Sequence, residues 1–372
     1  MNIHLLGPFL AFAVSPNNNS NNAPTAEASS GDSNFWPLLQ LPPDAAIHYD
    51  ESNGSKGHLE AVDSMMNYCA SHVTHMQTRR DLGGTDSALE GASWDSVTLR
   101  INNARRSECL LDRQGFQLVS CPVTGGEIHF KDSEDVIDHY YPLCEKVLLE
   151  STGASLVKAF DHNVRVSGSK NHDKEGNTVL QQPIGVVHND YTHVSAPRRL
   201  EQLGKPPKAN DSMKSRLEAQ GLNSLLDPTI VQEVLEGKRR FAFCNVWRNI
   251  QPCKTPIQQF PLACVDATTQ ELKDFLTFQI IYADRIGENY FSRYQTRHKW
   301  CYFPEMLPSE ALVLKQWDSQ GTLALKKEMD QVQDFISTFS LHSAFEDPSS
   351  PPDAPSRESI EVRCVLIWDK KE

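Results

Sequence analysis

The stretch Val186-Val187-His188-Asn189-Asp190-Tyr191 continues a short apolar run that begins at Ile184. If Ile184 to Asp190 forms a β-strand, His188 and Asp190 point to the same side of it, because side chains two residues apart share one face. An imidazole and a carboxylate directed at one point supply two of the three ligands of the 2-His-1-carboxylate triad that holds non-haem Fe(II). A His-x-Asp triplet also occurs by chance at polar strand ends. The iron interpretation therefore requires a second histidine and a binding place for a cosubstrate elsewhere in the chain.

Around this triplet the chain reads as a series of short strands separated by turn signals. Alternating or apolar runs predict strands at residues 96–101, 116–123, 155–160, 239–247, 261–265, 275–282, 293–303, 311–317, 341–345 and 360–368. Helices are predicted at residues 135–150 and near 229–236, and the basic stretch 196–220 is helical or irregular. Short strands in such a series are typical of a sandwich or jelly roll. We therefore expect a mainly β fold with buttressing helices, whose double-stranded β-helix (jelly-roll, cupin-like) core lies within residues 95–372.

The first 94 residues differ from the rest in composition and lack the regular pattern of short strands. Residues 1–34 include a low-complexity mixture of Asn, Ser, Ala and Pro, which predicts a disordered lead. Residues 35–94 predict an extended arm and an irregular region, with one weakly helical piece from Leu59 to Met76. The apolar run from Leu5 to Val14 resembles the core of a signal peptide, but no Lys or Arg precedes it and it is too short to span a bilayer.

Composition narrows the classes of partner. The chain has 36 basic and 48 acidic residues, a net charge of −12, and no basic tract, so we expect no nucleic-acid partner. Nine cysteines are scattered singly without a C-x-x-C motif, which argues against a zinc site or a disulfide framework and favours a reducing compartment. We therefore expect a cytoplasmic protein that binds a small molecule and has no membrane partner. The sequence leaves the oligomeric state open.

A second histidine suited to the triplet lies near the C-terminus. Of the 13 histidines, His342 follows the predicted strand at 311–317 and lies in a short strand-like piece of its own. Arg357-Glu358-Ser359 follows 15 residues later and opens the last predicted strand. A buried arginine requires an anion, and a carboxylate held by both guanidinium arms is its natural partner. The far carboxylate of 2-oxoglutarate is such an anion, and the keto-acid end of the same molecule chelates iron.

These features together resemble the fungal hydroxylase/desaturase family of Fe(II)/2-oxoglutarate-dependent oxygenases that includes the gibberellin desaturases. The resemblance covers residues 95–368, and several separate blocks carry it in the same order as in the family. These blocks are Asn103-Ala104-Arg105, Leu111-Asp112-Arg113-Gln114-Gly115-Phe116, Thr152-Gly153-Ala154, Phe160-Asp161-His162 with Arg165, Val187-His188-Asn189-Asp190, Asn245-Val246-Trp247-Arg248, Pro261-Leu262-Ala263, His298-Lys299-Trp300-Cys301-Tyr302-Phe303-Pro304, His342-Ser343-Ala344-Phe345, and Arg357-Glu358-Ser359-Ile360-Glu361-Val362-Arg363. Two features depart from the family pattern: Asn249 stands where the family usually has proline, and residues 319–340 lengthen the link into His342.

The resemblance implies an enzyme that uses O2 and decarboxylates 2-oxoglutarate to succinate and CO2. Its reaction would hydroxylate or desaturate an unactivated C–H position of a secondary-metabolite intermediate. It also implies a role for each candidate site residue. Fe(II) would be held by His188, Asp190 and His342; the cosubstrate by Arg357, Ser359, Tyr302 and Arg248; and the substrate by Asp161, His162 and Arg165.

Several of these residues have an ordinary structural alternative. Tyr302 is equally well explained as a core tyrosine, Arg248 as a structural cation, and His162 as a hydrogen-bonded structural histidine. Two other functions also stay open: a metal-dependent cupin-type enzyme that does not use 2-oxoglutarate, and a non-catalytic jelly-roll binding protein. Arg357 with Ser359 favours the cosubstrate over the first, and the intact His-x-Asp with a late histidine argues against the second.

The long link before His342 has two interpretations. Its apolar residues are spaced roughly as one helical face, which fits a lid over the mouth of the barrel. These residues are Leu323, Leu325, Met329, Val332, Phe335 and Ile336. The link fits equally well as a solvated excursion, because lengthening a surface loop costs little free energy. We favour the excursion, since the strands before and after the link read complete without it.

Overall fold

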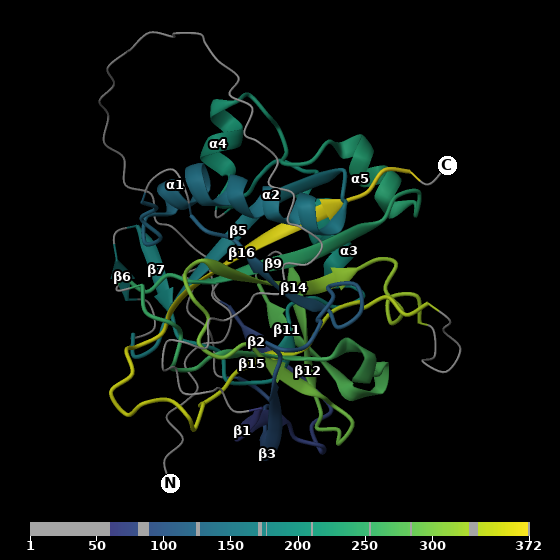
Figure 1. Cartoon of the computed structure of the whole chain (residues 1–372). Helices are drawn as coiled ribbons and strands as arrows, with labels where there is room; N and C mark the ends of the chain where they lie inside the picture. The colour runs from purple at the N-terminus through teal and green to yellow at the C-terminus, as the bar shows by residue number, and fades with distance from the viewer. Residues whose placement is uncertain are drawn as a thin grey trace.

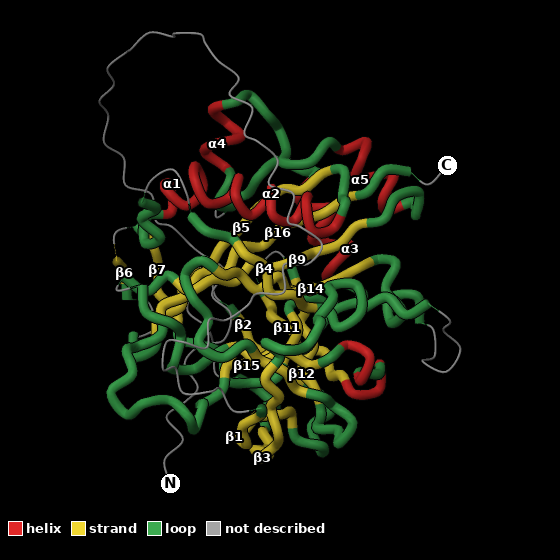
Figure 2. Tube along the Cα trace, viewed as in Figure 1, coloured by secondary structure: helices red, strands yellow, loops and turns green. Residues whose placement is uncertain are grey.

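The computed structural model describes residues 60–80, 89–123, 127–169, 173–175, 177–209, 211–252, 254–282, 285–326 and 334–370. The predicted disordered lead, the apolar run from Leu5 to Val14 and the arm up to residue 59 lie outside the described residues. Two β-sheets form the centre of the described chain, and the α-helices gather at one side of them (Figures 1 and 2).

The larger sheet holds nine strands in the order β1-β3-β13-β10-β15-β8-β12-β11-β2. Their bounds are β1 (Ala61–Cys69), β2 (Met76–Arg79), β3 (Trp94–Asn103), β8 (His188–Asn189), β10 (Leu262–Val265), β11 (Phe275–Ile281), β12 (Ile286–Ser292), β13 (Trp300–Tyr302) and β15 (His342–Ala344). In the middle of this sheet, β15 pairs with β10 on one side and with β8 on the other, so segments far apart in the sequence become neighbours.

The smaller sheet holds seven strands in the order β4-β14-β9-β16-β5-β7-β6. Their bounds are β4 (Phe116–Ser120), β5 (Leu156–Val166), β6 (Lys174–Glu175), β7 (Thr178–Gln181), β9 (Phe241–Asn249), β14 (Glu310–Asp318) and β16 (Glu358–Ile367). The last strand, β16, lies between β9 and β5 and is drawn in yellow in Figure 1. Arg357, which the sequence predicts to bind the cosubstrate, stands immediately before this central strand.

The main core lies between the two sheets. Met66 and Ile101 from the larger sheet and Phe243 and Val365 from the smaller sheet belong to one cluster of buried apolar side chains. Burial of this surface from water is the main force that holds two sheets face to face. The predicted mainly β, jelly-roll fold is confirmed by this arrangement.

A helical layer covers the outer face of the smaller sheet (Figure 2). It contains α1 (Ser133–Asp135), one π-helical turn, η1 (Val136–Tyr140), and α2 (Tyr141–Thr152). Because both faces of the sheet are covered, β9 is buried along its whole length and β16 almost so. Helix α2 ends at Thr152: Gly153 has φ +65° and its N–H donates to the carbonyl of Leu149 at 3.1 Å, a termination that glycine allows without a Cβ clash.

The remaining helices are short. They are α3 (Ser195–Leu203), α4 (Lys214–Ala219), α5 (Pro228–Leu235), and the 3-10 turns η2 (Ala267–Thr269) and η3 (Leu272–Asp274). No helix in the described part of the chain is long and apolar enough to cross a membrane. The cysteines that the structure describes are free thiols.

The helix predicted from Leu59 to Met76 is wrong. Residues 61–69 form β1, which pairs antiparallel with β3 along its whole length, from Ala61 opposite Asn102 to Cys69 opposite Trp94. The apolar residues of this piece recur at three- and four-residue spacing, as on a helix, but pairing with β3 overrides that weak local pattern. β1 and β2 therefore belong to the larger sheet, whereas the division of the chain into an arm and a domain at residue 95 stays a prediction.

Two strand predictions differ from the structure in extent. Of the strand predicted at 293–303, only Trp300–Tyr302 forms β13, and β12, from Ile286 to Ser292, was not predicted at all. β12 pairs with β11 along its whole length and with β8 at two positions, so pairing with its neighbours rather than a strong pattern of its own defines it. The N–H of Ser292 also donates to the carbonyl of Val187.

The link between β14 and β15 is not an exposed excursion at its start. Residues 322–326 form turns rather than a helix. Leu323 is 3% exposed and belongs to the core between the sheets, whereas Leu325 is 49% exposed. The N–H of Leu323 donates to Oγ1 of Thr338 at 2.9 Å, which ties the two ends of the link together. The excursion interpretation is therefore wrong for this part; residues 327–333 lie outside the described residues.

Candidate metal centre

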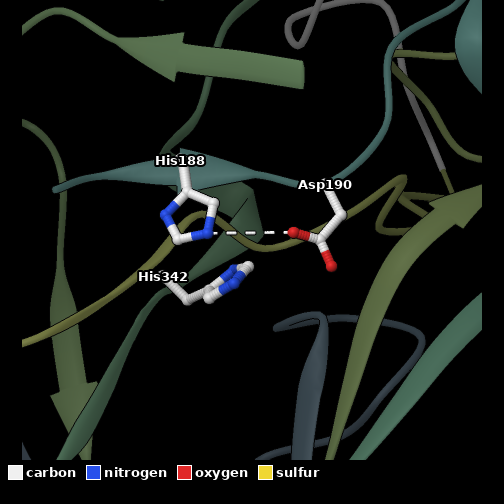
Figure 3. Close-up of side chains that lie close together, drawn as sticks. All are labelled: His188, Asp190 and His342. Carbon is white, nitrogen blue, oxygen red and sulfur yellow. Dashed lines mark ion pairs between the residues drawn. The ribbon is translucent and has the colours of Figure 1, made fainter. Parts of the chain in front are cut away.

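Three side chains converge between the strands in the middle of the larger sheet (Figure 3). His188 opens β8, Asp190 lies just beyond the end of β8, and His342 opens the neighbouring β15. Their ligand atoms all lie within 4.8 Å of one another, and His188 Nε2 is 3.8 Å from Asp190 Oδ1. Two imidazoles and one carboxylate at this spacing are the donor set of a facial triad, which leaves other coordination positions open.

The two histidines are oriented by backbone carbonyls. Nδ1 of His188 lies 2.7 Å from the carbonyl oxygen of Val186, and Nδ1 of His342 lies 3.3 Å from that of Ser340. Each carbonyl can only accept, so Nδ1 carries the proton and Nε2 keeps its lone pair. Burial lowers the pKa of both rings, and with the neighbouring His342 it lowers the pKa of His188 to about 4. Both rings are thus neutral, as metal binding requires.

The carboxylate of Asp190 is held through one oxygen. Its Oδ2 accepts a hydrogen bond from Asn245 Nδ2 at 3.1 Å and lies 3.6 Å from Arg363 Nε. Burial raises the pKa of Asp190, but its charged and hydrogen-bonding neighbours, Arg363 first among them, outweigh burial, so the pKa lies below its usual range. Asp190 is therefore ionised, with Oδ1 directed towards the two Nε2 atoms. Asn245 and Arg363 were not predicted as site residues, although both lie in stretches that carry the family resemblance.

A small pocket joins the three ligands to the predicted cosubstrate arginine. Its lining residues are Arg165, Ile184, His188, Asp190, Trp247, Leu262, His342, Ala344, Arg357 and Glu361. Arg357 is 1% exposed; its Nε donates to Ser359 Oγ at 3.0 Å and its guanidinium lies 5.2 Å from the centre of the Trp247 ring. Ser359 thus fixes the orientation of Arg357. The hydrogen bond from Ser359 to the cosubstrate stays a prediction.

The charge of Arg357 has no acidic partner in the described part of the chain. Its guanidinium donates hydrogen bonds to Oγ of Ser359 and to the carbonyl of Phe260. Glu361 lines the same pocket, but its carboxylate pairs with Arg363 at 3.2 Å. Burial and the nearby Arg165 lower the pKa of Arg357 to about 9. A buried cation of this kind is stabilised by an anionic ligand, so the pocket fits a carboxylate of 2-oxoglutarate beside the metal ligands.

Three predicted site residues do not come to this pocket. Arg248 lies on the opposite face of β9, with its guanidinium 5.1 Å from the Tyr140 ring in the helical layer. His162 lies on the outer face of β5, where its Nδ1 is 2.9 Å from the hydroxyl of Tyr141. Tyr302 packs edge-on against Phe345 with ring centres 5.1 Å apart and lies outside the pocket lining. Tyr302 and His162 therefore occupy the positions of core residues, whereas Arg248 is a buried cation without a carboxylate partner among the described residues. The predicted roles of all three stay predictions.

Asp161 and Arg165 point inward, because they alternate with His162 along β5. Asp161 Oδ2 accepts from Arg363 Nη1 at 3.0 Å, and Asp161 lines a second cavity that also contains Asp190. Arg165 lines the Arg357 pocket, and its Nη1 donates to the carbonyl of Gln182 at 2.9 Å. A substrate contact remains a prediction for both residues, and the geometry favours it more for Asp161.

The chain matches known proteins over most of its length. The family described as oxidoreductase/YMDC permease-like domain matches residues 66–224 and 218–367. An uncharacterized protein in the dcmA 3′ region of Methylophilus leisingeri is 38% identical over 175 residues, which is 46% of this chain and 80% of that protein. The hydroxylase/desaturase efuI of Hormonema carpetanum is 26% identical over 291 residues, 73% of this chain and 84% of that protein.

Two further similarities concern one fungal enzyme. The Fe(II)/2-oxoglutarate-dependent dioxygenase nvfI of Aspergillus novofumigatus is 26% identical over 282 residues, 74% of this chain and 84% of that protein. A solved structure of the iron and alpha-ketoglutarate-dependent endoperoxidase NvfI superposes with a TM-score of 0.62 at 21% identity and covers 84% of this chain and 99% of the other. At this identity the superposition shows a shared fold.

Proposed function

This chain belongs to the family described as the oxidoreductase/YMDC permease-like domain, and from that premise we propose that it is an Fe(II)- and 2-oxoglutarate-dependent oxygenase. Its fungal relatives carry the names hydroxylase/desaturase and Fe(II)/2-oxoglutarate-dependent dioxygenase. We infer that it hydroxylates or desaturates an unactivated C–H position of a small secondary-metabolite intermediate.

One observation supports this proposal above all: the buried His188, Asp190 and His342 share a pocket with a buried arginine that has no acidic partner among the described residues. A metal enzyme without 2-oxoglutarate, or a binding protein, would leave the position of Arg357 unexplained. When bound, Fe(II) and 2-oxoglutarate would allow O2 to act as the oxidant for C–H cleavage, with 2-oxoglutarate giving up two electrons as it becomes succinate and CO2.

The residues of the chain have distinct tasks in this proposal. Nε2 of each histidine and Oδ1 of Asp190 hold the metal, while Asn245 and Arg363 keep the other oxygen of Asp190 turned away. Arg357 binds the far carboxylate of 2-oxoglutarate, and Ser359 keeps its guanidinium in place. The three metal ligands and Arg357 are all less than one-tenth exposed, so the site excludes bulk water from the reacting groups.

A spectroscopic titration without oxygen tests the proposal. Fe(II) and then 2-oxoglutarate are added to the full chain, and the visible charge-transfer absorption of a chelated keto acid is measured. We expect the absorption to appear only when both are present, and to be lost when Zn(II) replaces Fe(II). Admission of air should then release succinate. A protein that binds Fe(II) but develops no absorption with 2-oxoglutarate would contradict the proposal and favour a metal enzyme of another kind.

A further inference from the structure

A second cavity, of about 150 Å³, shares Asp190 with the metal centre. Its inner wall includes Phe160, Asp161, Tyr191 and Asn289, which are buried. Its outer wall is made by α3, by the start of β12, and by residues that follow α3, namely Lys205, Pro206, Lys208, Asp211 and Ser212. A molecule held in this cavity therefore lies beside a metal ligand, which is where the substrate of the proposed reaction has to be.

Helix α3 directs two arginines at this cavity. One face of the helix is apolar and buried in the core between the sheets, through Ala196, Leu200 and Leu203. A second face lines the cavity, through Ser195, Arg198, Arg199 and Gln202. These four positions follow the i, i+3, i+4, i+7 spacing of one helical face. Packing of the apolar face thus fixes the rotation of α3 and places adjacent guanidinium groups at the cavity wall.

The cavity lining is basic in an acidic protein. The whole chain has 36 basic and 48 acidic residues. The lining has five basic residues, Arg198, Arg199, Lys205, Lys208 and Arg285, and four acidic residues, Asp161, Asp190, Asp211 and Glu288. Two of the acidic residues are engaged at the metal centre, because Asp190 is a ligand and Asp161 accepts from Arg363. Lys205 is paired with Glu201, which leaves four basic residues against Asp211 and Glu288 in the outer part of the cavity. This excess of positive charge attracts an anionic ligand.

Arg199 is the best placed of these cations. Its guanidinium carbon lies 5.0 Å from the ring centre of Phe160, which lines the same cavity. Its Nη2 lies 3.5 Å from Asp211 Oδ1 and its Nη1 lies 3.3 Å from Gln202 Oε1. A well-formed bond between a guanidinium and a carboxylate measures about 2.7–2.9 Å, so the contact with Asp211 is loose. A carboxylate arriving from the cavity can replace it, with its apolar body next to the Phe160 ring.

We propose that the substrate is a small molecule with an apolar body and one carboxylate group, and that the carboxylate binds Arg199. The apolar body lies against Phe160 and Tyr191 and extends towards Asp190. This inference rests on the proposed function, since it assigns the substrate class of the same site. Arg199 is a binding residue for the substrate and takes no part in holding the metal or 2-oxoglutarate.

Matched pairs of acids and neutral amides test the inference. The probes are 4-phenylbutyrate, naphthalene-1-acetate and dehydroabietate, each with its primary amide, which has nearly the same shape. Each is titrated without oxygen into the enzyme loaded with Fe(II) and 2-oxoglutarate, and binding is measured by calorimetry and by the change in the charge-transfer absorption. We expect at least one acid to bind about tenfold or more tightly than its amide, because a charge-assisted hydrogen bond is roughly twice as strong as a neutral one.

Three variants assign this preference to the proposed contact. Arg199→Gln should reduce the acid-to-amide ratio to near unity, whereas Asp211→Asn should increase it by removing the competing carboxylate. Arg216→Gln is the control, because Arg216 lies on α4, pairs with Asp138 and Glu134, and is outside the cavity lining. Opposite effects of the first two variants also separate loss of the contact from loss of folding.

Equal binding of acid and amide in all three pairs, or no binding by any of the acids, would overturn the inference. So would an acid preference that Arg199→Gln leaves unchanged. Failure of the proposed function is distinguishable, because in that case the charge-transfer absorption does not form before any probe is added.

Discussion

His188 and His342 lie directly opposite each other on the adjacent antiparallel strands β8 and β15, with ring centres 4.4 Å apart. They are far apart in the sequence, so the fold rather than local spacing brings their Nε2 atoms to one point. The carbonyls of Val186 and Ser340, each two residues before a histidine, fix both rings in the same way.

Removal of one metal ligand should abolish Fe(II) binding without unfolding the chain. We expect this for His188→Ala and Asp190→Ala, because the core between the sheets is packed independently of the ion. Fe(II) content is measured after anaerobic loading, and folding by circular dichroism. His139→Ala, whose side chain is 65% exposed in the helical layer, serves as the histidine control. Normal Fe(II) content and full turnover in both ligand variants would disprove the assignment.

Replacement of Arg357, the proposed cosubstrate-binding arginine, should weaken the binding of 2-oxoglutarate and leave metal binding unchanged. Arg357→Ala removes a charge-assisted contact of about 1.5–3 kcal/mol, so we expect the KM for 2-oxoglutarate to rise by roughly one to two orders of magnitude. Steady-state succinate release at varied 2-oxoglutarate measures this. Arg248→Met is the matched control, because Arg248 is equally buried but faces Tyr140 in the helical layer. A raised KM in the control together with an unchanged KM in Arg357→Ala would reverse the two roles.

The hydrogen bond from Asn245 to Asp190 should contribute to metal affinity. Partners that orient a metal ligand typically account for a 10–100-fold effect, so we expect Asn245→Ala to weaken Fe(II) binding by roughly that factor. Competition with a coloured chelator measures the change. Cys244→Ala is the control, because Cys244 directly precedes Asn245 in β9 and its side chain packs on the outer face of the smaller sheet. It should leave the Fe(II) affinity unchanged. Equal Fe(II) affinities in the parent and both variants would show that Arg363 alone is sufficient to orient Asp190.

Two leucines of the long link should differ in their effect on stability. Leu323→Ala leaves a cavity in the core between the sheets and should lower the free energy of unfolding by about 2–5 kcal/mol. Leu325→Ala, at an exposed position, should change it by less than about 0.5 kcal/mol. Urea unfolding followed by fluorescence distinguishes the two. Similar small changes in both variants would restore the interpretation of the whole link as a solvated excursion, and deletion of residues 321–336 would then be tolerated.

Those site residues that lie close together in the sequence can be predicted from it, whereas the position of His342 depends on how the strands pair. The His188-Asn189-Asp190 triplet and the Arg357-Glu358-Ser359 triplet each place two side chains on one side of an extended chain, which spacing alone reveals. His342 has no local signal and was selected among 13 histidines by its place in a jelly roll and by the family resemblance. Its partner strand β8 is two residues long in the structure, too short for a pattern to define.

Arg248 and His162 show why the sequence alone could not tell which side chains reach the pocket. In a strand with one exposed face, alternating polarity tells which residues point to the core. β9 is buried on both faces, so the sequence does not distinguish Trp247, which lines the pocket, from Arg248, which points the other way. β5 presents the same ambiguity for Asp161 and His162. The missing information is which sheet face the helical layer covers, and only the tertiary structure supplies it.

The ladder between β8 and β15 is one residue pair wide, whereas β5 and β16 pair at ten positions. The larger sheet therefore has its shortest strand pairing between β8 and β15, which carry the two histidine ligands. An ion bound by His188 and His342 would link these two strands across that boundary. Without the ion, the amide protons along this boundary should exchange with solvent sooner than those of β5 and β16. Fe(II) binding would then protect the protein from proteolysis as well as support its activity, because local separation of β8 from β15 exposes the backbone to proteases.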